Sequence, residues 1–340
     1  MRIALLTGGI SAERPISLRS SEGLKSFIAE TSHTCDIYDI PTDLDSFLGK
    51  YQEYDIVFPY IHGRYGEDGI ISGLCETLGL RYIGSPSTTH ALCIDKFRTN
   101  CVVEKLGITK VPKSWIPGMN SPTLLGLPES ITEPNPKEAE TPPLIVKPNC
   151  GGSTVATNKA TNVSELLSAI EEVHINTGAL AAGNIQLLGK NETFERHFPN
   201  YADAPLVQEY IDGDEYTVGV VGPNNAPEVL PIMQIVNLKS VLFDWKEKYE
   251  SDGSNEVFPL DLDKDLEQRL SEASRRIYTL LGCSGVVRID YRVRGNEIFF
   301  LEVNTFPGAT GASFIPKMWR KSGRTMGDFI TLLIETALKN

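Results

Sequence analysis

The first ninety residues alternate strand-like and helix-like segments, and this alternation restricts the possible folds more than any other feature of the chain. Strands are predicted over residues 2–7, 34–40 and 54–60, and a helix with one polar face over 17–30. Strands joined through helices form right-handed units with parallel strands. The pattern therefore predicts an α/β fold with an N-terminal parallel sheet built from a βαβ unit.

A glycine turn, Gly8-Gly9, ends the first predicted strand. The following residues lack the G-x-G-x-x-G spacing of a dinucleotide-binding turn, which disfavours a nicotinamide cofactor. Glu13 and Arg14 come next in the chain. They could reach a cleft at the carboxyl end of the sheet or cap the following helix, and the sequence leaves both readings open.

The chain has 340 residues, enough for two or three compact units. It contains no apolar run near the roughly 20 residues that a membrane helix needs. The formal net charge of −12 argues against nucleic acid or an anionic membrane as the main partner. We therefore expect a soluble, cytoplasmic protein that acts on small molecules.

The cysteines and histidines are widely spaced, without a C-x-x-C pair, so neither redox nor zinc chemistry is predicted. The six thiols are expected to be reduced and mostly buried. They are Cys35, Cys75, Cys93, Cys101, Cys150 and Cys283.

The strongest chemical pattern is Arg288-x-Asp290 on one predicted strand and Glu302-x-Asn304 on the next. Side chains two apart share a face of a strand, so each pair points one way. Whether both pairs share the same face depends on the turn near Gly295. An odd-length turn would place Asp290 opposite Glu302, whereas a two-residue turn would put the carboxylates on opposite faces.

Two carboxylates and an amide oxygen at Asp290, Glu302 and Asn304 are hard ligands suited to Mg²⁺. The alternative is a solvated polar face of the sheet. The metal reading is favoured because the other face is apolar and a Phe306-Pro307-Gly308 loop follows directly.

Lys147 ends a short predicted strand and precedes the glycine-rich turn Cys150-Gly151-Gly152-Ser153. Such a lysine and loop could neutralise and cradle phosphates, although the order is not that of a Walker A motif. The turn could equally be only a hairpin.

Three other segments are ambiguous. The loop at 61–69 contains His62 and three glycines after the third strand, and could form a ligand site or simply turns. The segment 244–249 could be a lid or an exposed loop. Residues 117–143 hold seven of the 21 prolines and are predicted to be a long loop or insertion.

Taken in order, these segments resemble the D-alanine–D-alanine ligases of the ATP-grasp superfamily over nearly the whole chain. The resemblance implies a three-domain fold, α+β in its later domains, with boundaries at 1–93, 94–206 and 207–340. The matching segments are Gly8 to Arg14, His62 to Gly69, Asp95-Lys96, Val146-Lys147-Pro148 with Gly152-Ser153, Glu209 to Glu215, Asp244 to Tyr249, Arg288-Ile289-Asp290 and Leu301 to Ser313.

The resemblance also implies ATP-dependent ligation of two D-alanine molecules through an acyl phosphate, for peptidoglycan synthesis, with two Mg²⁺ or Mn²⁺ ions and a homodimer. The implied cofactor and metal residues are Lys96 and Lys147 for phosphates, Gln208, Tyr210 and Glu215 for the nucleoside, and Asp290, Glu302 and Asn304 for metal. The implied catalytic and substrate residues are Glu13, Ser153, Tyr249, Arg288, His62, Lys248, Gly308, Ser313 and Phe314.

Several residues differ from the usual family pattern. Gln208 replaces an acidic residue, and its oxygen can still accept a hydrogen bond from adenine. Phe314 replaces a smaller aliphatic residue beside the implied second-substrate pocket. Two alternatives therefore stand beside D-alanyl-D-alanine synthesis: a ligase for another amino acid or hydroxy acid, and a nucleotide-binding protein without ligase turnover.

Overall fold

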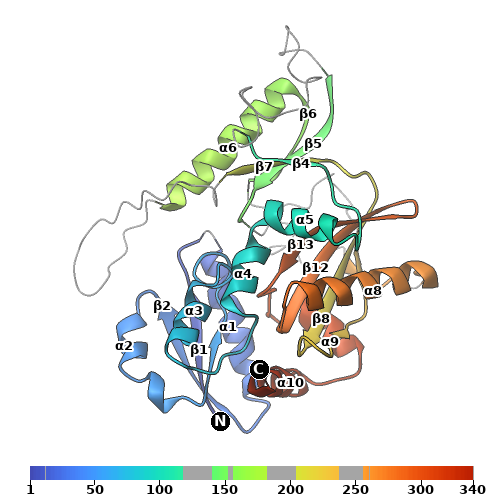
Figure 1. Ribbon diagram of the computed structural model, residues 1–340. Helices are drawn as coiled ribbons and strands as arrows, with labels where there is room; N and C mark the ends of the chain where they lie inside the picture. Colours follow the sequence, from blue (N-terminus) through green and yellow to red (C-terminus); the bar gives the residue numbers. More distant parts are fainter. Residues whose placement is uncertain are drawn as a thin grey trace.

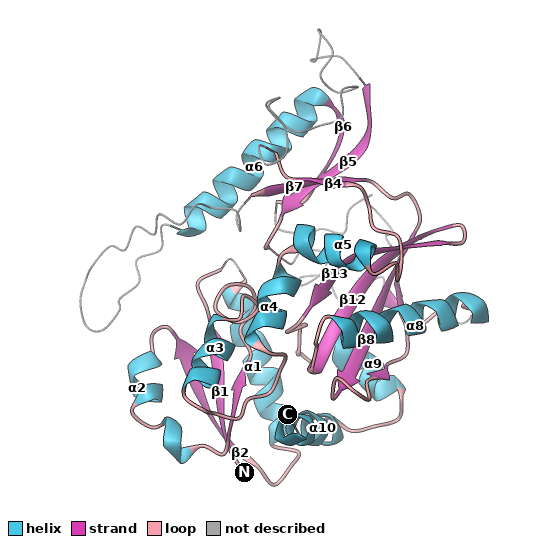
Figure 2. Cartoon of the chain, in the orientation of Figure 1, coloured by secondary structure: helices cyan, strands magenta, loops and turns pink. Residues whose placement is uncertain are grey.

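The computed structural model describes residues 1–11, 13–117, 140–151, 156–181, 204–236, 256–259 and 261–339. Its strands form three sheets that follow one another along the chain (Figures 1 and 2). Helices cover these sheets, as the α/β prediction requires. The predicted domain boundaries at 93 and 206 stay a prediction.

The N-terminal sheet has the order β2-β1-β3 and is parallel throughout, which confirms the predicted βαβ unit. The first helix begins at Arg14, earlier than predicted. Its first turn contains a proline, which suits that position because the backbone N–H groups of a first turn have no acceptor within the helix. The elements are β1 (Arg2–Gly8), α1 (Arg14–Ile28), β2 (Thr34–Ile40), α2 (Leu44–Leu48), the 3₁₀ turn Tyr51–Glu53, β3 (Ile56–Pro59), α3 (Ile70–Thr77) and α4 (Ser87–Ile94).

The second sheet is antiparallel and has the order β4-β7-β5-β6. Strands β5 and β6 form a hairpin around the glycine turn, as one of the two sequence readings predicted. The long helix α6 packs against β5 and β6. The elements are α5 (Lys96–Lys105), β4 (Ser114–Trp115), β5 (Glu140–Pro148), β6 (Asn158–Asn162), α6 (Val163–Ala181) and β7 (Pro205–Glu209).

The third sheet has the order β11-β10-β8-β12-β13, with β9 paired to β8. The two neighbouring strands predicted to carry Arg288-x-Asp290 and Glu302-x-Asn304 are both present. The elements are β8 (Asp214–Gly222), β9 (Glu228–Val229), β10 (Met233–Ile235), β11 (Glu256–Val257), α8 (Lys264–Leu280), β12 (Gly285–Arg294), β13 (Glu297–Asn304), α9 (Phe314–Lys321) and α10 (Met326–Lys339).

The turn between β12 and β13 differs from the odd-length turn that the sequence argument required. Arg294 pairs with Glu297, so the turn has only the two residues Gly295 and Asn296. A β-bulge between Asp290 and Tyr291 then shifts the register by one residue. The expected pairing of Asp290 with Glu302 is therefore present, but the bulge and not the turn produces it.

One hydrophobic core joins the two ends of the chain. Leu5 and Phe58 of the N-terminal sheet belong to the same buried cluster as Trp319 and Leu333 of α9 and α10. Helix α10 packs on α1 as well as on β8 and β12. The first and last segments of the chain therefore stabilise each other.

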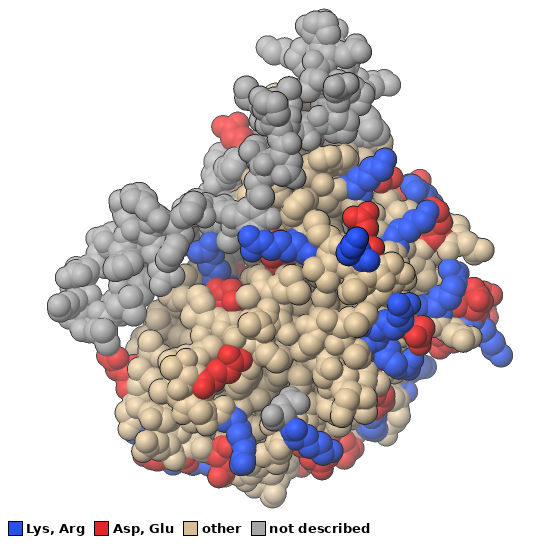
Figure 3. All heavy atoms as spheres, viewed as in Figure 1, with Lys and Arg blue, Asp and Glu red and all other residues tan. Residues whose placement is uncertain are grey.

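On the face shown in Figure 3, lysine and arginine side chains are interspersed with aspartate and glutamate. Among the described helices, none combines the length and the apolar character needed to span a membrane. The six cysteines are free, as predicted, but only Cys75, Cys93 and Cys283 are buried, whereas Cys101 is exposed.

The shared core predicts different effects for two leucines of α10. Leu333 is fully buried and Leu338 is 44% exposed. Leu333→Ala should lower the free energy of unfolding by about 2–5 kcal/mol, because it opens a cavity between α10 and its neighbours. Leu338→Ala should change it by less than about 0.5 kcal/mol. Urea unfolding of the two variants measures the difference, and equal losses would contradict the assignment of α10 to the core.

Candidate active site

The candidate site begins at the hairpin of β12 and β13. Asp290 lies opposite Glu302, and Arg288 lies opposite Asn304. The neighbouring positions Val287, Ile289 and Val303 are buried in the core behind the sheet. Strand alternation places each pair on one face, and the bulge brings both pairs to the same face. The sequence left this second point open, since it made the shared face depend on the turn.

Asp290 accepts hydrogen bonds from three other side chains. Nη2 of Arg288 lies 2.8 Å from Oδ2 of Asp290, and the Thr217 hydroxyl donates to Oδ1 at 2.6 Å. Nδ2 of Asn304 donates to both Asp290 and Glu302 at 3.3 Å. The carboxylate is thus held in a fixed orientation by charged and neutral donors.

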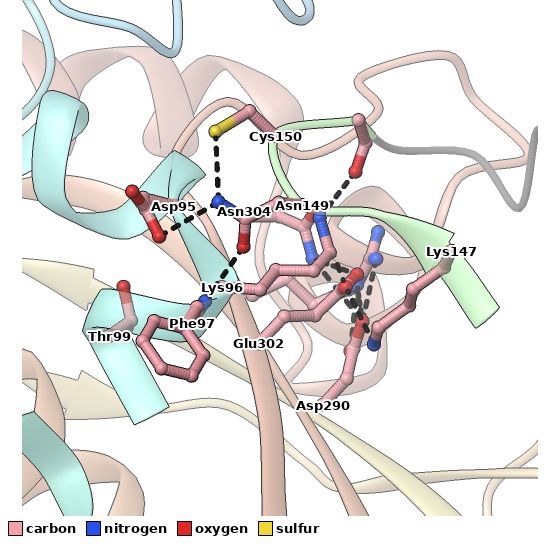
Figure 4. A network of polar contacts seen from close by, with 12 residues as sticks. Asp95, Lys96, Phe97, Thr99, Lys147, Asn149, Cys150, Asp290, Glu302 and Asn304 are labelled. Atoms are coloured by element: carbon pink, nitrogen blue, oxygen red, sulfur yellow. Dashed lines mark hydrogen bonds and ion pairs between the residues drawn. The ribbon is translucent and has the colours of Figure 1, made fainter. Parts of the chain in front are cut away.

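Two lysines from other elements converge on Glu302 (Figure 4). Nζ of Lys96, at the start of α5, lies 3.6 Å from Oε2 of Glu302, and Nζ of Lys147, near the end of β5, lies 3.9 Å from it. Burial lowers the pKa of Lys147, Glu302 opposes this shift and the adjacent Lys96 adds to it, with a net pKa of about 8. Two buried ammonium groups facing one carboxylate leave positive charge for an anionic ligand.

Asn149 fixes the position of Lys96. Its side chain donates to Asp95 at 3.0 Å and accepts from the backbone N–H of Phe97 at 2.9 Å (Figure 4). The Lys96 ammonium also donates to the carbonyl of Gly151, the first glycine of the turn that follows β5. The start of α5 and the glycine turn are therefore locked together by Asp95 and Asn149, two residues that were not singled out as site residues in the sequence.

The donor set fits a divalent cation by its chemistry. Among the described residues, no three histidine, cysteine, aspartate or glutamate side chains cluster as a metal site. Asp290 and Glu302 provide two carboxylates, and Asn304 adds an amide. Mg²⁺ is commonly held by one or two carboxylates together with phosphate oxygens and water, so this set fits Mg²⁺ bound with a phosphate ligand.

The three residues implied for nucleoside binding lie on β7, β8 and the segment between them. Gln208 is buried and donates to Ser114 at 2.9 Å. Glu215 is paired with Arg292 at 2.7 Å. The ammonium of Lys159 lies 3.9 Å from the centre of the Tyr210 ring, a cation–π contact.

A pocket lies between the hairpin and the N-terminal sheet. Its lining includes Glu13, Glu67, Lys96, Glu302 and Asn304. Glu13 therefore reaches the cleft, and its side chain makes no capping bond to α1. Glu67 is not among the predicted site residues, although it stands in the same glycine-rich loop as His62. Burial and the nearby Glu13 carboxylate raise the pKa of Glu67 to about 7.

His62 is buried against α1 and does not line this pocket. Its Nε2 lies 3.0 Å from the hydroxyl of Ser20, and its backbone N–H donates to Ser17 at 2.9 Å. Burial, together with the charge of Arg288, lowers the pKa of His62 to about 4. These contacts are typical of a buried structural histidine, and its neutral ring lies close enough to Arg288 to be affected by its charge.

The implied second-substrate residues lie beside Arg288. The guanidinium of Arg288 lies 5.3 Å from the centre of the Phe314 ring. Ser313 precedes α9, and its hydroxyl accepts from the backbone N–H of Thr310 at 3.1 Å. A side chain at Gly308 would approach the Ser313 hydroxyl to 2.9 Å, so the loop is tight at that glycine.

The structure therefore brings together eight of the implied residues, from four parts of the chain. They are Glu13, Lys96, Lys147, Arg288, Asp290, Glu302, Asn304 and Phe314. Ser153, Lys248 and Tyr249 lie outside the described residues, as do the segment 244–249 and residues 118–139 of the loop predicted at 117–143. Residues 140–143 were wrongly predicted as loop, since they belong to β5, which begins at Glu140.

Comparison with known proteins agrees with this arrangement. Residues 41–85 match the family model of the D-ala D-ala ligase N-terminus, and residues 191–335 match that of the C-terminus. The chain is 32% identical to the D-alanine–D-alanine ligase of Fervidobacterium nodosum, covering all of this chain and 99% of the relative. It is 31% identical to that of Coprothermobacter proteolyticus, covering 99% and 100%.

The D-alanine–D-alanine ligase of Bacillus anthracis has a similar fold, with a TM-score of 0.76 at 26% identity over all of this chain and 98% of that one. The same enzyme complexed with ATP gives a TM-score of 0.72 at 24% identity, covering 100% and 97%. The fold and the site thus define an ATP-grasp protein. Within that class, the chain belongs to the D-alanine–D-alanine ligase family.

A second buried histidine, His90, predicts a pH effect on stability. Burial lowers the pKa of His90 to about 3, whereas an unfolded histidine has a pKa of about 6.5. The unfolded state therefore gains a proton below about pH 6.5 that the folded state does not, so the stabilisation by neutral His90 is lost as the pH falls. The expected loss is about 2 kcal/mol at pH 5.

His90→Gln removes this titration. The variant should lose less stability than the wild type between pH 7 and pH 5, whatever its stability at pH 7. Urea unfolding at both pH values measures this, and parallel losses in the two proteins would show that His90 does not titrate in this way.

Proposed function

We propose that this protein ligates two D-alanine molecules with ATP, through an acyl phosphate, to give D-alanyl-D-alanine. The observation that carries the proposal is the convergence of Lys96 and Lys147 on Glu302, opposite Asp290. Phosphoryl transfer is catalysed mainly by positioning and by neutralising charge, and this cluster provides cations and metal-binding oxygens in one place. The family membership supports the choice of substrates.

In this proposal, Lys96 and Lys147 bind the phosphates of ATP, and Gln208, Tyr210 and Glu215 surround its adenosine. The buried Gln208 donates to Ser114, which leaves its oxygen to accept from the adenine amino group. Asp290, Glu302 and Asn304 hold Mg²⁺, with two ions expected. When bound, the metal supplies charge neutralisation on the transferring phosphoryl group.

The amino-acid substrates occupy the opposite side of the same site. Arg288 and the backbone N–H of Gly308 stabilise the oxyanion that forms when the second amine attacks the acyl phosphate, as such donors do in acyl transfer. Glu13, Ser153 and Tyr249 orient the first D-alanine beside His62. Lys248, Ser313 and the backbone at Phe314 meet the carboxylate of the second.

One alternative, a ligase of the same chemistry with a different second substrate, rests only on the contact between Phe314 and Arg288. An aromatic ring occupies space beside Arg288 at 5.3 Å. The shape of such a pocket discriminates by only about 1–3 kcal/mol for one methylene group. A different amino acid or a hydroxy acid is therefore the second candidate. A homodimer and a cytoplasmic location remain further proposals from the family resemblance.

Phosphate release with Mg²⁺ and ATP tests the proposal. We expect release with D-alanine alone, with D-alanyl-D-alanine identified by mass. L-alanine, D-serine, D-lactate and glycine complete the panel, each alone and with D-alanine. Release only with a mixed pair would establish the alternative substrate, and ATP binding without release under any condition would refute ligase activity.

Glu302→Gln should reduce turnover at least about 100-fold, because it removes a metal ligand and the anion that faces both lysines. Glu297→Gln is the matched control on the same strand, since Glu297 is an exposed partner of Lys110. The control should retain activity within about two-fold. Mn²⁺ binding, followed by electron paramagnetic resonance, should weaken only in Glu302→Gln. Full activity of that variant would overturn the metal assignment.

A further inference from the structure

Glu67 occupies a position between two loops that belong to distant parts of the chain. It lies in the loop between β3 and α3, it is buried, and it lines the pocket that also includes Lys96 and Glu302. Its carboxylate has no described lysine or arginine partner in an ion pair, although Lys96 lies close enough to affect its charge. The Glu67 carboxylate is held instead by backbone N–H groups of two loops.

Each oxygen of the Glu67 carboxylate accepts a hydrogen bond from a different loop. Oε2 accepts from the N–H of Gly63 at 2.8 Å, within its own loop. Oε1 accepts from the N–H of Phe306 at 3.2 Å, in the loop after β13. The Glu67 side chain thus connects its own loop to a backbone segment that lies 239 residues further along the chain.

Other contacts hold the loop after β13 against the N-terminal sheet at the same place. The Tyr60 hydroxyl donates to the carbonyl of Pro307. His90 Nδ1 lies 2.7 Å from the Thr305 hydroxyl, and the His90 ring stacks on Phe306 with centroids 4.6 Å apart. Residues 305–307 are therefore held through the side chains of Thr305 and Phe306, the N–H of Phe306 and the carbonyl of Pro307. Among these contacts, Glu67 supplies the only charged acceptor.

The two backbone groups that Glu67 binds lie next to proposed substrate positions. Gly63 follows His62, beside the first amino acid. Phe306 precedes Gly308 by two residues, and Gly308 is a proposed oxyanion donor. A displacement of about 1 Å between reacting groups can reduce a rate about 100-fold, so the separation of these loops matters for ligation.

We propose that Glu67 is a positioning residue that sets the separation between the two substrate loops through the N–H groups of Gly63 and Phe306. Its carboxylate acts through these two backbone donors. This inference rests on the proposed function, because that function assigns substrates to the two loops. The bonds themselves are independent of that assignment, and they can be measured without it.

The test is Glu67→Gln, in the full-length protein. The amide has the size of the carboxylate but offers only one oxygen, so an NH₂ group must face one of the two backbone donors. We expect faster hydrogen exchange at Phe306 or Gly63, a KM for D-alanine raised about ten-fold, and a KM for ATP within about two-fold of the wild type. A purely structural role would not separate the two KM values.

Glu76→Gln is the matched control. Glu76 lies on α3 of the same sheet unit and also accepts several hydrogen bonds, from Ser87 at 2.6 and 2.9 Å and from Tyr82 at 2.6 Å. It is exposed and does not line the pocket. Its variant should leave both KM values and the exchange at Phe306 unchanged.

The outcomes are distinct. Glu67→Gln with wild-type exchange at both amides, or with wild-type KM for D-alanine, overturns the inference. Should that variant not fold, Glu67→Asp replaces it, because aspartate keeps the charge but has a shorter side chain. Hydrogen exchange at the two amides and the KM for D-alanine are then measured on Glu67→Asp, with the same criteria. Absence of D-alanine ligation by the wild type would instead refute the proposed function, while hydrogen exchange still shows whether Glu67 holds the loops.

Discussion

The β-bulge between Asp290 and Tyr291 is the constraint on which the candidate site depends. With a two-residue turn and a regular ladder, Asp290 would lie opposite Leu301, and Glu302 would point into the core. A slip of one residue moves every following side chain to the other face of a strand. The bulge absorbs this slip, so that both carboxylates share a face while the apolar residues nearer the turn keep their places in the core.

Once the carboxylates share a face, the remaining problem is the cost of burying their charge. Asp290 is compensated within its own strand by Arg288. Glu302 is compensated by Lys96 and Lys147, which come from the start of a helix and from a strand of another sheet. Buried charges are tolerated where they are paired and hydrogen-bonded. The two lysines and the carboxylates therefore compensate one another's charge. A phosphate would match the charge of the lysines, and a metal ion would match the charge of the carboxylates.

The position of the N-terminal sheet follows from a second set of contacts. Buried residues of β1, β3 and α1 share one core with α9 and α10, and Tyr60 and His90 bind the loop that leaves β13. Such packing is not readily deformed, because protein interiors are close-packed. The pocket between Glu13 and Asn304 is thereby formed by two parts of the chain whose packing in a shared core also stabilises the fold.

The sequence by itself determined the local features: the parallel βαβ unit, the alternation of β12 and β13, and the choice of Asp290, Glu302 and Asn304 as metal-binding candidates. These depend on period and residue type, which are local properties. Only the tertiary structure decided that these side chains converge, through the bulge, and that Lys96 and Lys147 face Glu302. It alone revealed Glu67, because a hydrogen bond from Phe306 joins residues far apart in sequence, and no local pattern records which distant backbone will come to lie beside a side chain.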